Sequence, residues 1–218
     1  MRIRFDAELE SVRKNLVQMG DTTLSLLTEA LTAIVEPEAH RSARASELEA
    51  LTDHQHRLIH DQCLNLITLQ APVAGDARLV TGILDAIVDL ELIGDYAYEM
   101  VALSSSISHR PPSQVLVQIT DVGAKIRASL ATAVESWRNG DRAQALSVRP
   151  NEARIRAECE SLYQKLSQLV STPGQGTDYV ELMIVCKHLE RILRHAGSVA
   201  DQAADAAPMP QAMTGAGP

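Results

Sequence analysis

The sequence predicts an all-α protein built from two tandem, internally repeated three-helix bundles, with six long helices in total. Aromatic residues make up only 3% of the 218 residues, whereas hydrophobic residues, mostly Leu, Ala, Val and Ile, make up 45%. That composition favours close-packed helices over sheets, in which aromatic residues are enriched. Glycine and proline cluster at a few places, and long helices with short connections between them form bundles.

Three helices are expected in the first half of the chain, each ended by a break. They cover about 3–35, 42–70 and 73–105, with Pro37 and Pro72 in the first two breaks. Proline stops a helix because it lacks the backbone N–H and clashes with the preceding turn. The segment SSSISHRPPS follows the third helix.

The second half repeats this order. The double proline at 111–112 opens a helix to about 138, and two more helices cover about 141–171 and 177–204. The Leu-Glu motif of the third helix recurs 99 residues later in the sixth: Leu90, Glu91, Ile93 and Ala97 correspond to Leu189, Glu190, Ile192 and Ala196. The repeated pattern predicts a duplication. We expect a first repeat over 1–106, a second over 113–204 and a disordered Pro/Gly/Ala-rich tail over 205–218.

Charge and composition bear on the class of protein. The net charge of −8 argues against nucleic-acid binding, which needs a basic surface that displaces counterions. The N-terminus MRIRFDAELE lacks the apolar core of a signal peptide, and no segment approaches the ~18 apolar residues of a membrane span. We therefore expect a soluble, cytoplasmic protein. Its three well-separated cysteines predict buried free thiols.

A row of carboxylates stands out in the third predicted helix. Glu91, Asp95 and Glu99 are four residues apart, on the stripe that is apolar one turn earlier, whereas Asp89 points elsewhere and is expected on the surface. Like charges at this spacing repel by ~0.2–0.5 kcal/mol per pair, and residues 79–100 contain no Arg or Lys. The row therefore requires a basic partner, protonation or a bound metal.

The second predicted helix offers a matching face. Asp53, His56 and His60 lie within about 60° of one another around that helix, with Glu49 adjacent. Carboxylate oxygens with imidazole nitrogens suit iron, zinc, manganese or nickel. A solvated or salt-bridged face is the alternative. The chain has no Glu-x-x-His, which disfavours a ferritin-like di-iron oxidase, and no nucleotide-binding or hydrolase motif.

Four segments carry a resemblance to a known family: the opening MRIRFDAELESVRKNLVQMG, CLNLITLQAPVAGDARLV at 63–80, DLELIGDYA at 89–97 and HLERILRHAGSVAD at 188–201. They resemble the PhoU family, phosphate-signalling regulators of bacteria and archaea, and the likeness covers about 1–204. The resemblance implies a PhoU-like fold of two three-helix bundles whose Glu/Asp-x-x-x-Asp motifs bind iron or zinc.

The same resemblance implies a function without enzymatic activity. Members repress phosphate uptake and the phosphate-starvation (Pho) response, as adaptors between the phosphate ABC transporter ATPase and a sensor histidine kinase. The resemblance further implies a homodimer that associates with membranes only through these partners. Two alternatives stay open: a divergent helical-bundle interaction protein without metal, and a metal-dependent bundle enzyme.

Carried over residue by residue, the resemblance assigns Glu91 and Asp95 to the first metal motif and adds Glu99 where Asn is usual. Asp53 matches the acidic position of the second helix, and His60 stands where the family is often acidic. In the second motif Glu190 is retained, but Arg194 replaces the aspartate. We expect Arg194 to form a salt bridge with Glu190 at i+4 and the second repeat to have lost its metal site.

Overall fold

The described part of the protein is entirely helical, as the sequence predicts. The structure is a computed structural model, and it describes residues 2–36, 39–70 and 74–207. The helices are α1 (Arg2–Val35), α2 (Ala39–Gln70), α3 (Ala74–Ser106), α4 (Ser113–Asn139), α5 (Arg142–Leu146), α6 (Arg149–Leu169) and α7 (Gly176–Ala206). Most of the expected tail, 208–218, lies outside the described residues, but residues 205 and 206 belong to α7.

The predicted continuous helix over 141–171 is wrong, because the structure divides it into α5 and α6. Gly140 ends α4 with a left-handed φ of 64°, and the Asp141 side chain caps α5 by accepting a hydrogen bond from the backbone N–H of Gln144. Pro150 then occupies the first turn of α6, where its missing N–H is tolerated. Pro150 is therefore the sequence signal for this break.

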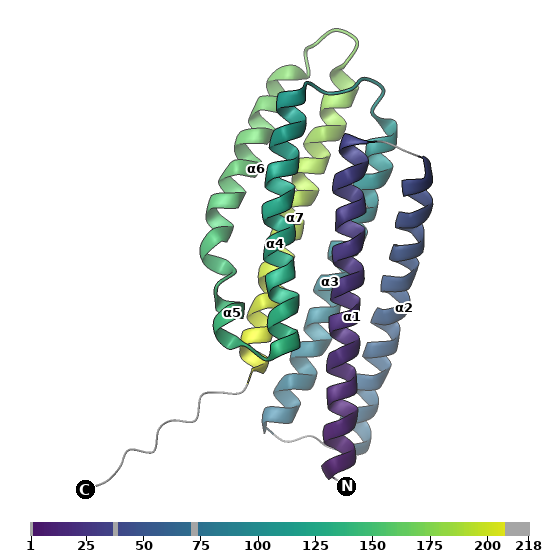
Figure 1. Cartoon of the computed structure of the whole chain (residues 1–218), viewed down its shortest axis with the longest axis vertical. Coiled ribbons are helices and arrows are strands. Elements are labelled where there is room, and N and C mark those ends of the chain that lie inside the picture. The colour runs from purple at the N-terminus through teal and green to yellow at the C-terminus, as the bar shows by residue number, and fades with distance from the viewer. Residues whose placement is uncertain (1, 37–38, 71–73, 208–218) are drawn as a thin grey trace, which may run out of the picture.

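The two bundles lie side by side and share one core (Figure 1). Helices α1, α2 and α3 form the first bundle, and α4, α6 and α7 the second. The most extensive contact joins α3 to α7, and α1 packs against α4, which leaves α2 and α6 at the two outer sides. The buried apolar residues of both bundles belong to a single hydrophobic cluster. The fold is therefore a duplicated structure without a separate core for each copy.

The buried positions of the two bundles correspond. In α3 and α7 the pairs are Ile83 and Leu182, Ile87 and Cys186, Leu90 and Leu189, Ile93 and Ile192, and Ala97 and Ala196. In α2 and α6 they are Leu48 and Ile155, Thr52 and Cys159, and Ile59 and Leu166. This shared register identifies equivalent surface positions in the two copies.

Two equivalent glycines allow α1 and α4 to approach closely. A Cβ atom on Gly20 of α1 would lie 2.6 Å from Cγ2 of Val134 in α4. A Cβ atom on Gly123 of α4 would collide with the side chain of Leu31 in α1. Leu31 and Val134 occupy equivalent places, so the same contact is made twice, once in each direction.

We expect Gly20→Ala to lower the free energy of unfolding by about 1–2 kcal/mol. Overpacking costs about 1–3 kcal/mol, partly offset by the higher helix propensity of alanine, about 1 kcal/mol, and branched Val134 meets the new methyl with several atoms. Urea denaturation followed by circular dichroism measures the change. The control Gly75→Ala adds a methyl that meets nothing within 4 Å and should be neutral or stabilising. A stabilising Gly20→Ala would contradict the packing.

Asp89 departs from its expected surface position. Its carboxylate accepts hydrogen bonds from His195 Nδ1 and Gln202 Nε2 of α7, each at 2.7 Å, and the side chain is 15% exposed. Helix periodicity predicts one buried face for α3, but α3 is covered twice, by its own bundle and by α7. A polar side chain on the second face is partly buried and has hydrogen-bond partners, as desolvation requires.

The three cysteines are free and buried, as predicted. Burial raises the pKa of the thiols of Cys63 and Cys186 to about 12 and that of Cys159 to about 11. A thiol that stays protonated is unreactive and a poor metal ligand. No helix among the described residues has the length and apolar character needed to cross a membrane.

Candidate metal centre

Three carboxylates meet where α2 packs against α3. Glu49 and Asp53 lie one turn apart on α2, and Asp95 lies on α3. One oxygen from each lies within 4.8 Å of the other two. Glu49 and Asp53 are partly buried, whereas Asp95 is exposed. The helix pair thus assembles an acidic cluster from residues of both elements, open to solvent on the side of Asp95.

Electrostatics in this cluster oppose a negative charge on two of its members, Asp95 and Glu49. The pKa of Asp95 is raised, first by partial desolvation of its carboxyl and then by the charges of Glu91, Asp53, Glu49 and Glu99. The pKa of Glu49 is raised by burial and by Asp53. Both effects disfavour the ionised form, so the cluster is stabilised by whatever neutralises it, either a proton or a cation.

The donor set fits a hard or borderline metal ion. Carboxylate oxygens ligate Mg²⁺, Ca²⁺ and Mn²⁺, and they occur with imidazole in iron and zinc sites. An imidazole is also present on this side of α2, that of His56, whose Nδ1 lies 3.3 Å from Oε1 of Glu91. Because the three oxygens already lie near one another, small side-chain movements would place them around one ion. Glu49, Asp53 and Asp95 would hold such an ion, with Glu91 and His56 beside them.

The residues assigned from the sequence are only partly brought together. Asp53 and Asp95 lie in the cluster, and Glu91 stands beside it, paired with His56. Glu99 turns toward α7, where its Oε2 lies 3.2 Å from Nε2 of His188. His60 is exposed and lies 3.5 Å from Asp61. The ligand roles of Glu99 and His60 stay predictions, but the geometry does not group them with the other carboxylates.

Glu49 is the member that the sequence analysis left out of its ligand set. Its spacing of four residues from Asp53 was the available signal, since i and i+4 share a helix face. A competing cation also lies nearby, because Arg57 approaches the Asp53 carboxylate at 3.6 Å. The arginine of that pair is exposed to solvent, so the pair contributes little to stability. It does not neutralise the other two carboxylates.

In the second bundle the predicted pair between Glu190 and Arg194 is wrong. Glu190 accepts a hydrogen bond from Lys187 Nζ at 2.9 Å, and the same ammonium lies 3.7 Å from Glu160 of α6. Lys187 therefore neutralises carboxylates of two helices, α6 and α7. A pair between Arg194 and Glu190 would lie within α7 alone. Arg194 instead lies 3.4 Å from Nε2 of His195. Among the described residues, the second bundle holds no group like that of Glu49, Asp53 and Asp95.

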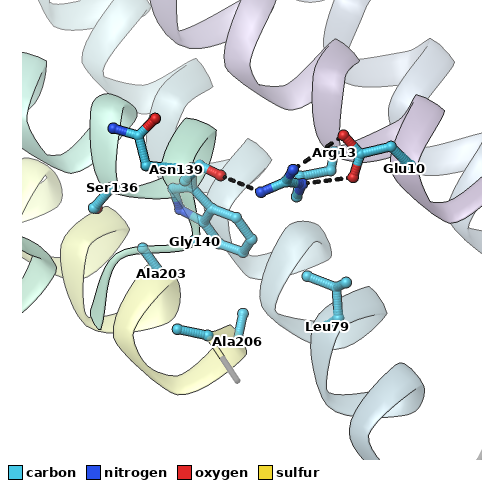
Figure 2. Close-up of a pocket in the computed structure, with 10 residues that line it drawn as sticks. Glu10, Arg13, Leu79, Ser136, Asn139, Gly140, Ala203 and Ala206 are labelled. Carbon is cyan, nitrogen blue, oxygen red and sulfur yellow. Dashed lines mark hydrogen bonds and ion pairs between the residues drawn. The ribbon is translucent and has the colours of Figure 1, made fainter. Parts of the chain in front are cut away.

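A cavity of about 340 Å³ lies elsewhere, between the two bundles (Figure 2). Arg13 of α1 borders it, held by Glu10 at 2.9 Å and by the backbone carbonyl of Trp137 at 3.0 Å. Apart from Asn139, the remaining lining is small or apolar and includes Leu79, Ser136, Ala203 and Ala206. Leu79 and Asp95 are about 24 Å apart along α3, so this cavity is separate from the carboxylates. Its described lining contains no nucleophile paired with a base.

Comparison with known proteins gives the same domain twice. A family model described as the PhoU domain matches residues 16–103 and 119–203. A PhoU homologue of Pseudomonas putida, called a phosphate-specific transport system accessory protein, is 26% identical over 200 residues, covering 91% of this chain and 78% of that protein. The Synechocystis homologue with the same description is 26% identical over 201 residues, covering 92% and 90%.

Solved structures show the same fold. The crystal structure of PhoU from Pseudomonas aeruginosa matches with a TM-score of 0.86 at 24% identity, covering 91% of this chain and 96% of that one. The phosphate transport system regulatory protein PhoU from Streptococcus pneumoniae matches with a TM-score of 0.83 at 18% identity, covering 91% and 94%. Because the two matched domains span most of the sequence, this chain belongs to the PhoU family.

Proposed function

We propose that this protein is a non-enzymatic accessory regulator of phosphate transport that binds metal at the acidic cluster of Glu49, Asp53 and Asp95. The observation that carries the proposal is the approach of three carboxylate oxygens to within 4.8 Å of one another on a bundle face. Homologues described as phosphate-specific transport system accessory proteins support phosphate as the nutrient whose transport is regulated. The family resemblance favours iron or zinc as the ion.

The metal would act here as a fixed positive charge. A divalent or trivalent ion supplies the neutralisation that the repelling carboxylates lack. Glu49 and Asp53 would hold it from α2 and Asp95 from α3, so binding would tie the outer helix to the shared core. Glu91, which contacts His56, would lie beside the ion. The ion would therefore stiffen the outer face of the first bundle.

The side of α2 opposite Glu49 carries exposed apolar side chains suited to a partner. Leu51 and Leu58 of α2 are 44% and 42% exposed, and they lie seven residues apart on one side of the helix. Leu69 continues the same side. Exposed apolar patches rimmed by polar residues mark interaction surfaces. We infer that α2 contacts the transporter ATPase, the sensor histidine kinase or a second copy in a homodimer, and that the cytoplasmic protein represses phosphate uptake and the Pho response through such contacts.

The decisive experiment compares metal content and partners in the same purified samples. We expect the wild-type protein to contain about one or more metal ions per chain by elemental analysis and to co-purify with the transporter ATPase and the kinase. Asp53→Asn/Asp95→Asn removes two of the three facing charges and should reduce bound metal about tenfold or more. Its recovery of partners from cells with abundant phosphate should fall as well.

The matched control is Glu160→Gln/Glu190→Gln, which removes two carboxylates of the second bundle, at the positions that correspond to Asp53 and Glu91. It should retain the metal. Equal metal loss in both double variants, or a metal-free wild-type protein, would contradict the metal centre and favour an interaction protein without metal. Turnover of phosphoesters or of oxygen by the purified wild type would favour the bundle enzyme instead.

A further inference from the structure

Cations gather on the second bundle, at the face that matches the acidic cluster. A cavity of about 290 Å³ is lined by Arg156 of α6 and by Lys187, Glu190, Arg191 and Arg194 of α7. Four of its five lining side chains are positive, in a chain whose net charge is −8. A concave basic site on an acidic protein is a local feature that the overall charge does not explain.

The repeat register shows how the two faces differ. The buried pairs of the two copies make Arg156 the counterpart of Glu49 and Arg194 the counterpart of Asp95. Two of the three carboxylates in the acidic cluster are thus replaced by guanidinium groups. Glu160 is the counterpart of Asp53 and stays acidic. The duplicated framework therefore presents opposite charge at equivalent positions.

Two of the cations are already engaged by carboxylates. Lys187 bonds to Glu190 at 2.9 Å and lies over the ring of Tyr163. Arg156 forms an ion pair with Glu152, which also holds Arg149. The positive charges of Lys187 and Arg156 are therefore at least partly neutralised. Any unneutralised positive charge of the cavity must belong to its other two cations.

The unneutralised charge belongs to Arg191 and Arg194. Arg191 lies over the Tyr96 ring, 5.3 Å from its centroid, and Arg194 lies 3.4 Å from Nε2 of His195. Within the part of the chain that the structure describes, neither guanidinium has a carboxylate within 4.0 Å. They lie one helical turn apart on α7 and are exposed, so each repels the other. Such a pair is stabilised by an anion that both can reach.

We propose that this cavity binds a phosphate group. A guanidinium presents a planar fork of donors that matches two phosphate oxygens, and a lysine adds a point charge. Arg191 and Arg194 would bind the oxyanion from α7, with Arg156 facing them from α6 and Lys187 one turn before Arg191 on α7. The group is either inorganic phosphate or the terminal phosphate of a nucleotide. The site is independent of the acidic cluster and needs no metal.

Calorimetric titration of the full-length protein, stripped of metal with EDTA, tests the proposal. The probes are inorganic phosphate and ATP, each in chloride buffer at low ionic strength. We expect saturable binding of at least one probe, and the tighter one identifies the source of the phosphate group. Arg191→Gln/Arg194→Gln should weaken that binding about tenfold or more, because charge-assisted hydrogen bonds are lost.

The control Arg127→Gln/Arg154→Gln removes two other exposed arginines of the second bundle and should bind like the wild type. Thermal unfolding of all three proteins verifies that the variants are folded. An absence of saturable binding to the wild type, or equal weakening in both double variants, would overturn the proposal. Metal content at the first bundle is measured separately, so failure of either site leaves the other standing.

Discussion

Trp137→Ala is expected to lower the free energy of unfolding by about 3–5 kcal/mol, the range for removing a buried large aromatic side chain. Trp137 is the only tryptophan and is 3% exposed. It reaches from α4 to both α3 and α7, the two helices with the most extensive contact. Its Nε1 donates a hydrogen bond to the carbonyl of Val199 in α7 at 3.0 Å, and its ring borders Gly82 of α3. Loss of the indole would therefore weaken the interface between the two bundles.

The measurement is urea or thermal unfolding followed by circular dichroism, because the substitution removes the fluorescent residue. We expect the midpoint to fall by about 6–20 °C and unfolding to remain a single transition, since one core serves both bundles. Trp137→Phe keeps most of the apolar contact and should cost about 1–2 kcal/mol. An alanine variant as stable as the phenylalanine variant would show that the indole does not fill this space.

Asp95→Asn is expected to stabilise the metal-free protein and to abolish its stabilisation by metal. The neutral amide removes repulsion from Glu91 and Glu99, worth about 0.2–0.5 kcal/mol per i,i+4 pair, so the metal-free midpoint should rise by about 1–4 °C. Metal at about 100 times its dissociation constant stabilises a folded protein by about 2.7 kcal/mol. The wild-type midpoint should then rise by about 5–10 °C with metal, and that of the variant should barely move.

The pH dependence gives the same prediction a second readout. The pKa of Asp95 in the folded protein is raised above its ordinary value of 3.8, so the unfolded chain releases this proton first. The metal-free wild type therefore loses stability as the pH rises from about 4 through the raised pKa, and Asp95→Asn lacks this decline. The exposed carboxylate Asp85 on the same helix provides the control, Asp85→Asn. A lower midpoint for metal-free Asp95→Asn would contradict the repulsion.

Much of this fold is readable from local sequence. Pro37, Pro72 and the double proline at 111–112 mark helix boundaries that the structure places within a few residues. The Leu90-Glu91 motif and its copy reveal the repeat, and the same positions turn out to be buried in equivalent ways. Propensity and periodicity act over a few turns, so these features need no information about which helices touch. Pro150 carried the same kind of signal for the α5–α6 break.

The candidate site was predictable only in part. Helix geometry alone places Asp95 beside Glu91 and Glu49 beside Asp53. It does not tell which side-chain row of α2 meets which row of α3, and so it did not select Glu49 over His60. The contacts of Glu99 with His188 of α7 and of Lys187 with Glu160 of α6 join residues that are remote in sequence.

By itself, then, the sequence determined an all-helical duplicated chain of the PhoU family with an uncompensated row of carboxylates. Only the tertiary structure decided which charges meet. It grouped Glu49, Asp53 and Asp95, moved Asp89 into the α3–α7 interface, and set Arg191 and Arg194 around a cavity. The physical reason is that secondary structure follows from short-range preferences, whereas the neighbours of a charge follow from the rotation and register of packed helices.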